Sequence, residues 1–589
     1  MEFSMPAGHR RLGIRSFGGT ILDLLSHHSR DMSSVLTSAA SFVGELPASF
    51  WYSIPPAIFI VFLFVRGGLR WQTLKNVRGP PQGGWLLGHQ TEFYQQIDVG
   101  ELDFAWHNAY GGAWKIDGCF GRNILMLSDP AAIHHTIHTM GYDYPKTTES
   151  KTFTGLAFGR GVSWAGGETH VRHRKLLAPA FTAQAQRPFY PVFRRVAGQL
   201  TSQWRDKLQE GDCSEFQTIE ICRGLTNATL DIIGEAVFDY HFGSLDKLGE
   251  KNEFADCFHN LFADSNLFPP NAAILFAASW AYWPEFLLRK VEHLPFRQFI
   301  RFKEFLTIGK RLGKELIVNQ AAAVDGKKRR DILSILVEAN EATKKADRLS
   351  EDEVLSQVTT LLFAGHETTA TTLTWIMYEL ARHPEDQERV REEIRTKRQK
   401  VTANGQKDFT STDLESFTFT NACIKEGLRM HPISPWITRE ARVDDVIPLH
   451  EPIIGVDGKV MNQVEVVAGQ PVLVSTCAYN RHPAVWGPDS HEWNPRRHLN
   501  QEMKDKQIPV GVYSNLLTFA GGPSGCMGWR FALTEMQSTV VELVENFEFC
   551  PPLDKNAKML RTPVGAIMAP MIEGKFDERT QMPLGVRPL

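Results

Sequence analysis

The chain has 589 residues, of which 43% are hydrophobic and 22% are charged, an ordinary globular composition with enough apolar material for a large core. Its formal net charge of −3 shows no bias that would point to nucleic-acid binding. The eight cysteines are scattered without any C-x-x-C pair, so zinc ribbons and thioredoxin chemistry are unsupported and a reducing compartment is indicated.

The first candidate element is an uncharged stretch at residues 47–65, preceded by Glu45. As a helix its 19 residues would reach roughly 28 Å, close to the hydrocarbon thickness of a bilayer, with a kink at Pro55 and Pro56. Four basic residues follow it: Arg66, Arg70, Lys75 and Arg78. Positive charges favour the cytosolic side, so residues 1–78 are predicted to form an N-terminal region with one membrane anchor. A buried core helix is the alternative interpretation.

Residues 79–88 are rich in proline and glycine, which resist helix formation and indicate a stiff turn. From about residue 100 onward the pattern is mostly helical. Phe254, Phe258 and Phe262 are spaced by four and should share one helix face. That face either packs in the core or lines a lipophilic substrate channel that also touches the bilayer.

A long helix is predicted over residues 351–382, because a capping-box pattern begins at Ser350 and a proline follows His383. Apolar residues occur nearly all round it, as in a helix that crosses an interior. The polar cluster A-G-H-E-T-T at 364–369 interrupts it, which is costly unless the polar groups are satisfied or used. Gly365 is expected to let a ligand approach the backbone. A simple helix kink is the alternative.

Glu426 and Arg429 stand three apart on a predicted helix and so share one face. Apolar neighbours favour a buried pair over a surface ion pair. Residues 446–474 alternate apolar and polar side chains around an Asp-Gly turn, which predicts a strand hairpin. Two polar stretches, 325–331 and 395–407, are predicted to be surface loops.

The most specific motif is F-A-G-G-P-S-G-C-M-G at residues 519–528, followed by a predicted helix from 529 to about 547. Glycines give backbone room for a flat cofactor, and a helix start offers N–H groups to the sulfur of Cys526. Both features favour a thiolate, which can be the axial ligand of a haem iron. A buried structural cysteine beside a glycine turn is the alternative.

This run resembles the haem-binding loop of the cytochrome P450 family, F-x-x-G-x-R-x-C-x-G. Phe519, Gly522, Cys526 and Gly528 fall on the pattern, and Ser524 stands where the family usually has an arginine. The cluster at 364–369 is similar to the family's A-G-x-[DE]-T motif, and the Glu-Arg pair to its E-x-x-R motif.

The resemblance implies a mainly α fold with small β-sheets, the cytochrome P450 fold. Residues 79–589 would form a single triangular catalytic domain, joined to an N-terminal membrane anchor at about 47–65.

The resemblance also implies roles for individual residues. Cys526 would be the axial ligand of iron in haem b (iron protoporphyrin IX). Thr368 would support bound dioxygen, and Glu367 would supply protons. Arg497, in the loop W-N-P-R-R-H, would join Glu426 and Arg429 in a structural lock behind the cysteine. Three further residues would contact the haem propionates: His170, Arg174 and Arg439.

The implied activity is that of a haem-thiolate monooxygenase, which inserts one oxygen atom from O2 into a lipophilic small molecule. A terpenoid or another secondary metabolite is the first substrate class to test. Electrons would come from NADPH through a membrane-bound NADPH-cytochrome P450 reductase, with cytochrome b5 as an additional donor, at the endoplasmic reticulum membrane. The alternatives are a peroxide-using or rearranging haem-thiolate enzyme and a non-catalytic haem-binding membrane protein.

Overall fold

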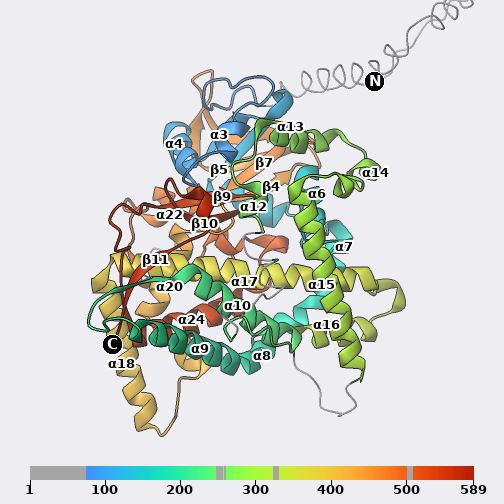
Figure 1. The fold of residues 1–589 in the computed structure, drawn as a ribbon. Coiled ribbons are helices and arrows are strands. Elements are labelled where there is room, and N and C mark those ends of the chain that lie inside the picture. Colours follow the sequence, from blue (N-terminus) through green and yellow to red (C-terminus); the bar gives the residue numbers. More distant parts are fainter. Residues whose placement is uncertain (1–73, 247–256, 258–260, 323–330, 501–507) are drawn as a thin grey trace, which may run out of the picture. The chain divides into compact units, whose positions relative to one another are not determined.

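The computed structural model describes residues 74–246, 257, 261–322, 331–500 and 508–589. Residues Arg70–Leu589 cluster into one compact unit. This unit is mainly helical with small sheets, which confirms the predicted fold class (Figure 1). The predicted anchor at 47–65 lies outside the described residues. Among the helices that are described, none is both long and apolar enough to cross a bilayer.

The α-helices are α3 Gln90–Tyr94, α4 Glu101–Tyr110, α5 Pro130–His134, α6 Thr148–Phe158, α7 Gly167–Leu177, α8 Ala183–Gln186, α9 Tyr190–Gln209, α10 Ile221–Phe238, α12 Ala263–Asn266, α13 Asn271–Ser279, α14 Glu285–Leu288, α15 Arg297–Ala322, α16 Ile332–Ala342, α17 Glu351–Arg382, α18 Pro384–Ala403, α19 Ser411–Glu415, α20 Phe419–Met430, α21 Thr476–Asn480, α22 Pro483–Trp486 and α24 Trp529–Asn546. Short 3-10 helices join them: η1 Cys119–Gly121, η3 Ala178–Phe181, η4 Arg187–Phe189, η5 Trp280–Tyr282, η6 Val291–His293, η7 Lys345–Asp347, η8 Pro495–Leu499, η9 Leu517–Phe519, η10 Gly522–Ser524 and η11 Phe576–Glu578. The turn η2 His135–Thr139 is a π-helix.

The strands are β1 Ala113–Asp117, β2 Asn123–Leu127, β3 Gln217–Glu220, β4 Trp436–Glu440, β5 Asp445–Ile454, β6 Val460–Val466, β7 Pro471–Ser475, β8 Phe547–Cys550, β9 Met559–Val564, β10 Ile567–Ile572 and β11 Pro583–Pro588. They form a four-stranded sheet in the order β1-β2-β7-β4, a three-stranded sheet in the order β3-β11-β8, and the hairpins β5-β6 and β9-β10. In the larger sheet only β2 and β7 run parallel. The hairpin predicted within 446–474 is confirmed, since β5 and β6 flank a turn with Gly458 at φ +78°.

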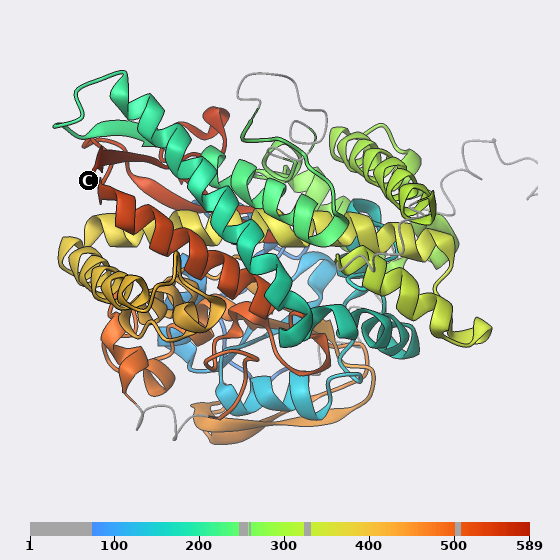
Figure 2. The same cartoon turned by 90° about the horizontal axis from the view of Figure 1, so that it is seen from below.

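Helix α17 is the central element, and its predicted bounds are confirmed. At its start the Ser350 hydroxyl accepts from the Glu353 N–H, and the Glu353 carboxylate accepts from the Ser350 N–H, which completes the capping box. Helices α10, α15, α20 and α24 all pack against it, and both views show it running through the helical layer (Figures 1 and 2). Contact on most sides explains why its apolar residues are not confined to one stripe.

One predicted loop is wrong. The stretch 395–407 is largely helical, because α18 continues to Ala403. Val390, Ile394 and Val401 are buried on one face of α18, and this apolar spacing holds the charged segment in a helix. The predicted loop at 325–331 and the helix face of Phe254 and Phe258 lie largely outside the described residues.

Candidate active site

The cysteine loop, residues 517–528, is held by its own backbone. The Cys526 N–H donates to the Phe519 carbonyl at 2.8 Å, and the Gly525 N–H donates to the Gly522 carbonyl at 3.1 Å. Gly522 has φ +60°, and a Cβ there would lie 1.8 Å from the carbonyl oxygen of Ile137 in η2. Gly522 is therefore required by a close approach within the protein, whereas the sequence suggested room for a cofactor.

Cys526 has an accessible side chain, although protein surrounds it densely enough that burial raises the pKa of its thiol. Solvent accessibility and a pKa raised by burial occur together when a side chain faces a cavity inside the protein. Hydrogen bonds from the Gly528 and Trp529 N–H groups and the charge of Arg174 lower the pKa, but by less. These N–H groups therefore favour a thiolate, as predicted, but burial outweighs them and leaves the pKa of the free thiol raised. A bound metal ion would itself favour the deprotonated sulfur.

The middle of α17 is also accessible, although the turns on either side of it are buried. Ala364 is exposed and Thr368 is partly exposed, whereas Leu362 and Thr369 are buried. The Thr368 hydroxyl donates to the Ala364 carbonyl at 2.8 Å. This bond fixes the hydroxyl hydrogen and leaves the oxygen lone pairs able to accept. The accessible part of α17 therefore offers the Thr368 hydroxyl oxygen as a hydrogen-bond acceptor, whereas the rest of the helix is largely buried.

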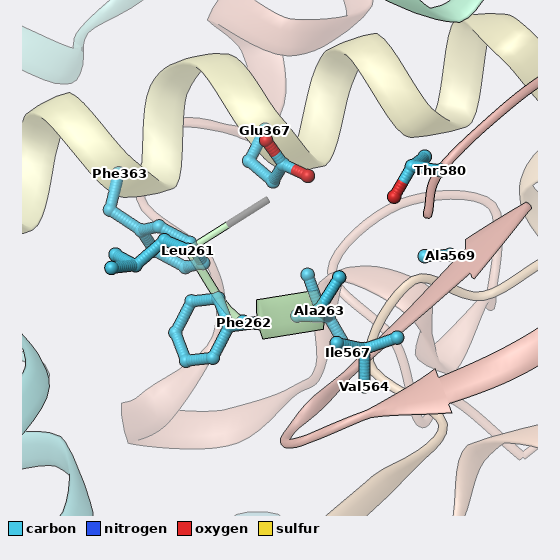
Figure 3. A pocket seen from close by; sticks show the side chains of 9 residues that line it. All are labelled: Leu261, Phe262, Ala263, Phe363, Glu367, Val564, Ile567, Ala569 and Thr580. Atoms are coloured by element: carbon cyan, nitrogen blue, oxygen red, sulfur yellow. The ribbon is translucent and has the colours of Figure 1, made fainter. Parts of the chain in front are cut away.

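Glu367 points to another side of α17. Together with Phe363 it lines a cavity of about 10 Å³ beside Ile567 and Thr580, room for about one water molecule (Figure 3). Burial raises the pKa of Glu367 to about 7, so its carboxyl group can hold or release a proton near neutral pH.

Gly365 does not face a ligand space. A Cβ at this position would lie 2.1 Å from Cδ1 of Ile233 in α10. The glycine therefore allows α10 and α17 to approach each other, and the prediction that it admits a ligand is wrong.

The three residues predicted to contact propionates lie in one neighbourhood. Arg174 donates to the Gly525 carbonyl at 2.7 Å, which ties α7 to the cysteine loop. His170 Nδ1 lies 3.2 Å from the Tyr142 hydroxyl, and burial with nearby positive charges, among them Arg174 and Arg439, lowers the pKa of His170 to about 4. Arg439 is buried in β4, which lowers its pKa to about 10.

Within the described part of the chain, none of these three residues forms an ion pair. Arg174 and Arg439 are therefore cations without a counter-charge among the described residues, which is costly, and carboxylates are their natural partners. His170, with a pKa of about 4, is neutral near pH 7 and can donate one hydrogen bond. A donor set of one cysteine sulfur and several carboxylate-binding groups fits haem, with its iron and two propionates.

Glu426 is the centre of a fully buried polar network. Its carboxylate accepts from Arg429 through two bonds of 2.8 Å, from Arg497 at 3.0 Å and from the Asn494 N–H at 2.8 Å, and it lies 2.9 Å from His498 Nε2. Although burial favours the neutral acid, Arg429 and then His498 hold the pKa of Glu426 well below its usual range. Removing one member of such a network costs about 3–5 kcal/mol.

This network is connected to the cysteine loop. Arg429 donates to the Asn480 carbonyl at 2.7 Å. The Asn480 side chain accepts from the Leu517 N–H at 3.1 Å and donates to the Thr518 hydroxyl at 2.9 Å. The Thr518 hydroxyl in turn donates to the Leu428 carbonyl at 2.7 Å. The Glu-Arg pair therefore fixes the start of the loop through α21.

Sequence reasoning missed Asn480 and Lys146. Asn480 is the last residue of the mostly apolar segment that forms β7 and α21, and nothing else in the sequence marks it. Lys146 follows a proline, and its half-burial has no signal in its neighbours in the chain.

A larger cavity of about 460 Å³ lies between the four-stranded sheet, α6, α13 and the β9-β10 turn. Most of its wall is apolar or aromatic, with Phe93, Phe153, Ile274, Trp280, Trp436 and Ile437 among the lining residues. Arg439 and Lys146 also line it. Its volume and lining are those of a site for a small lipophilic molecule.

Comparison with known proteins agrees with these observations. The family model described as Cytochrome P450 matches residues 78–575. Cytochrome P450 monooxygenase 205 of Postia placenta is 32% identical over 530 residues, which is 87% of this chain and 93% of that protein. Cytochrome P450 monooxygenase claW of Ampulloclitocybe clavipes is 30% identical over 507 residues, or 84% of this chain and 90% of the relative. Both similarities extend over most of either chain.

Proposed function

Because the chain belongs to the cytochrome P450 family and is a cytochrome P450 monooxygenase, we propose that Cys526 holds a haem at which one oxygen atom of O2 is inserted into a lipophilic small molecule. The observation that carries this proposal is the setting of Cys526. Its side chain is accessible inside dense protein, directly before α24, and Arg174 bonds the neighbouring carbonyl.

Two groups of residues would hold the haem, one at its iron and one at its propionates. Cys526 would bind the iron through its sulfur, and His170, Arg174 and Arg439 would bind the propionates. Haem in this position supplies the iron chemistry for activating O2 and transferring one oxygen atom. The network around Glu426 keeps the loop that carries the cysteine in place.

Protons would be handled on α17. Glu367 holds a proton up to about pH 7 and lines a cavity with room for one water molecule, so it can pass a proton to water inside the protein. The hydroxyl oxygen of Thr368, next in sequence, can accept a hydrogen bond on the accessible face of the helix. Together they would deliver protons while bulk water stays outside.

The cavity of about 460 Å³ supports a lipophilic substrate, because apolar and aromatic side chains dominate its wall. A terpenoid or another secondary metabolite is the first class that we would test. Electrons would come from NADPH through the membrane-bound reductase, with cytochrome b5 as an additional donor. The uncharged stretch at 47–65 supports an anchor in the endoplasmic reticulum, with the catalytic residues 79–589 in the cytosol.

The test of the ligand assignment is Cys526→Ala, with Cys213→Ala as the control because Cys213 is an exposed cysteine far from the loop in sequence. We expect the first variant to lose haem and the absorption band of the reduced carbon-monoxide complex, and the control to keep both. Retention of haem and of this band in Cys526→Ala would contradict the proposal.

The test of the reaction type is product formation in microsomes that contain the reductase. We expect product with NADPH and O2, and a screen of lipophilic compounds by haem spin state would supply the substrate. Product formation with peroxide alone would favour a peroxide-using enzyme instead.

A further inference from the structure

Lys146 is a half-buried lysine that the proposed mechanism does not use. It follows Pro145 in the segment between η2 and α6, and its ammonium group donates to the Ala165 carbonyl at 3.2 Å. This bond uses one of its three N–H donors. Lys146 lines the cavity of about 460 Å³ together with Arg439.

The charges around Lys146 do not balance. Burial and then the charges of Arg439 and Lys151 lower the pKa of Lys146 to about 8. Glu149 lines the same cavity, but its carboxylate and that of Glu440 both pair with Arg122, at 2.7 and 2.5 Å, and neither pairs with Lys146 or Arg439. Neither Lys146 nor Arg439 forms an ion pair within the described ranges.

A partly buried cluster of positive charges without an anion is unfavourable. The missing partner should therefore be an anion, and a planar carboxylate can accept from an ammonium and a guanidinium at once. The same neighbourhood reaches His170 and Arg174, since Lys146 and Arg174 both lower the pKa of His170. Arg174 in turn bonds the cysteine loop.

The loop itself lacks a positive charge at the position where the related family pattern has arginine. Ser524 stands there, at the end of η10, and it is neutral. Lys146 is a cation from a different part of the chain. It lies near His170, as does Arg174, which bonds this loop.

We propose that Lys146 and Arg439 together bind a carboxylate at the wall of this cavity, so that Lys146 supplies the positive charge that Ser524 leaves out. The proposal rests on the proposed function, since one source of the carboxylate is a haem propionate. The other source is the carboxylate of a lipophilic acid in the cavity.

The first arm measures the rate at which the purified ferric holoprotein loses haem to excess apomyoglobin. Lys146→Met should lose haem about tenfold faster, because a hydrogen bond to a charged group contributes about a factor of ten or more. Lys146→Arg should stay close to the wild-type rate. Lys175→Met is the matched control, because Lys175 is exposed on α7 beside Arg174.

A compensating variant separates charge from packing. Ser524→Arg alone should retain haem, and Lys146→Met/Ser524→Arg should recover most of the wild-type haem retention. Lys146→Gln repeats the measurement if the methionine variant does not fold. Failure of the added arginine to restore retention, where Lys146→Met has lost it, would mean that Lys146 acts through packing and would overturn the proposal.

The second arm distinguishes the source of the carboxylate. Dodecanoic acid and 1-dodecanol are titrated into wild type and Lys146→Met, and binding is followed by the haem spin state. If the acid is the partner, the variant should lose about tenfold in affinity for dodecanoic acid relative to 1-dodecanol while haem retention is unchanged. An unchanged haem-loss rate together with an unchanged ratio of the two affinities would overturn the proposal. If wild type binds neither probe, the first arm decides alone.

These outcomes are distinguishable from failure of the proposed function. Retention of haem in Cys526→Ala would remove the iron-ligand assignment, whereas the Lys146 variants change the rate of haem loss or the selectivity for acids in a protein whose cysteine is intact.

Discussion

Two carboxyl groups with raised pKa values, the partly buried Glu367 and the fully buried Glu535, have different surroundings. Glu367 lines a cavity with room for one water molecule, so its proton has a route out of the side chain. Glu535, on α24, is fully buried beside Thr369, and neither of its carboxyl oxygens has a hydrogen-bond partner of good geometry among the described residues. A neutral acid in the first setting can take part in proton transfer, whereas in the second it mainly costs stability.

Glu367→Gln should slow product formation roughly 100-fold, because the amide cannot release a proton. The pKa of about 7 gives the sign of the pH dependence: the proton-donating form predominates below pH 7, so the wild-type rate should fall as pH rises through that value. The variant should lack this fall. The measurement is the rate between pH 6 and 8.5, with the exposed Glu351→Gln at the start of α17 as the control.

Glu535→Gln should become more stable than wild type as pH rises. Burial raises the pKa of Glu535 well above its ordinary value of 4.5, so the unfolded chain ionises first and the wild-type free energy of unfolding falls above that pH. Glutamine does not ionise and removes this dependence. Thermal unfolding of both proteins between pH 5 and 8 checks the prediction, and a difference that does not change with pH would contradict it.

At the residue scale, the sequence correctly predicted that the E-x-x-R pair and the later arginine loop meet. Glu426, Arg429 and Arg497 meet in one buried network, and His498, which departs from the usual aromatic residue, joins it through Glu426. The environment of Lys146 could not be predicted, because its neighbour Arg439 comes from a distant strand.

At the scale of elements, the packing of α10 on α17 depends on a single missing methyl group. Gly365 lies in the helix interior, where alanine would usually be more stable by about 1 kcal/mol. The place that a Cβ would take is occupied by Ile233. The two helices would have to separate or Ile233 would have to change its rotamer.

Gly365→Ala should therefore lower the free energy of unfolding by about 1–3 kcal/mol, the usual cost of overpacking, although helix propensity alone predicts the opposite sign. Ile233→Ala removes Cδ1 and Cγ1 of Ile233, the atoms that a Cβ at position 365 would overlap. A double-mutant cycle measured by chemical unfolding should give a favourable coupling of about 1 kcal/mol or more between the two substitutions. Additive effects would mean that the two positions do not compete for space.

Element bounds were predictable where start and stop signals are strong. The capping box at Ser350 and the proline after His383 define α17 to the residue. The polar composition of 395–407 hid a helix, although Val390, Ile394 and Val401 already carried a helical spacing. The sheet pairing of β2 with β7 could not be derived, because parallel strands far apart in sequence have no turn between them that sets their register.

At the scale of the whole molecule, the compact unit begins close to the basic residues that follow the predicted anchor. Leu74 and Val77 are buried in the core of this unit. The Arg78 carbonyl accepts from the Lys115 N–H at 2.9 Å. Residues 74–78 therefore contribute to the catalytic fold, although the sequence assigned them to the N-terminal region.

Deleting residues 1–69 should release the protein from microsomal membranes in high salt and leave its haem in place. A deletion through residue 78 is the matched comparison, since it also removes Leu74 and Val77 and should lower the melting temperature. Centrifugation and the reduced carbon-monoxide spectrum measure both effects. Continued sedimentation of the shorter deletion with membranes would contradict an anchor at 47–65.

The last strand has a practical consequence for anyone who expresses this protein. Strand β11 lies between β3 and β8, and the Leu589 N–H donates to the Asn546 carbonyl at 3.0 Å. A stop codon before Pro583 would leave two strands without their shared partner, one leading into α10 and the other out of α24. Leu589 itself is 57% exposed, so an epitope inserted behind it should leave β11 paired, whereas an epitope that replaces residues 583–588 should not.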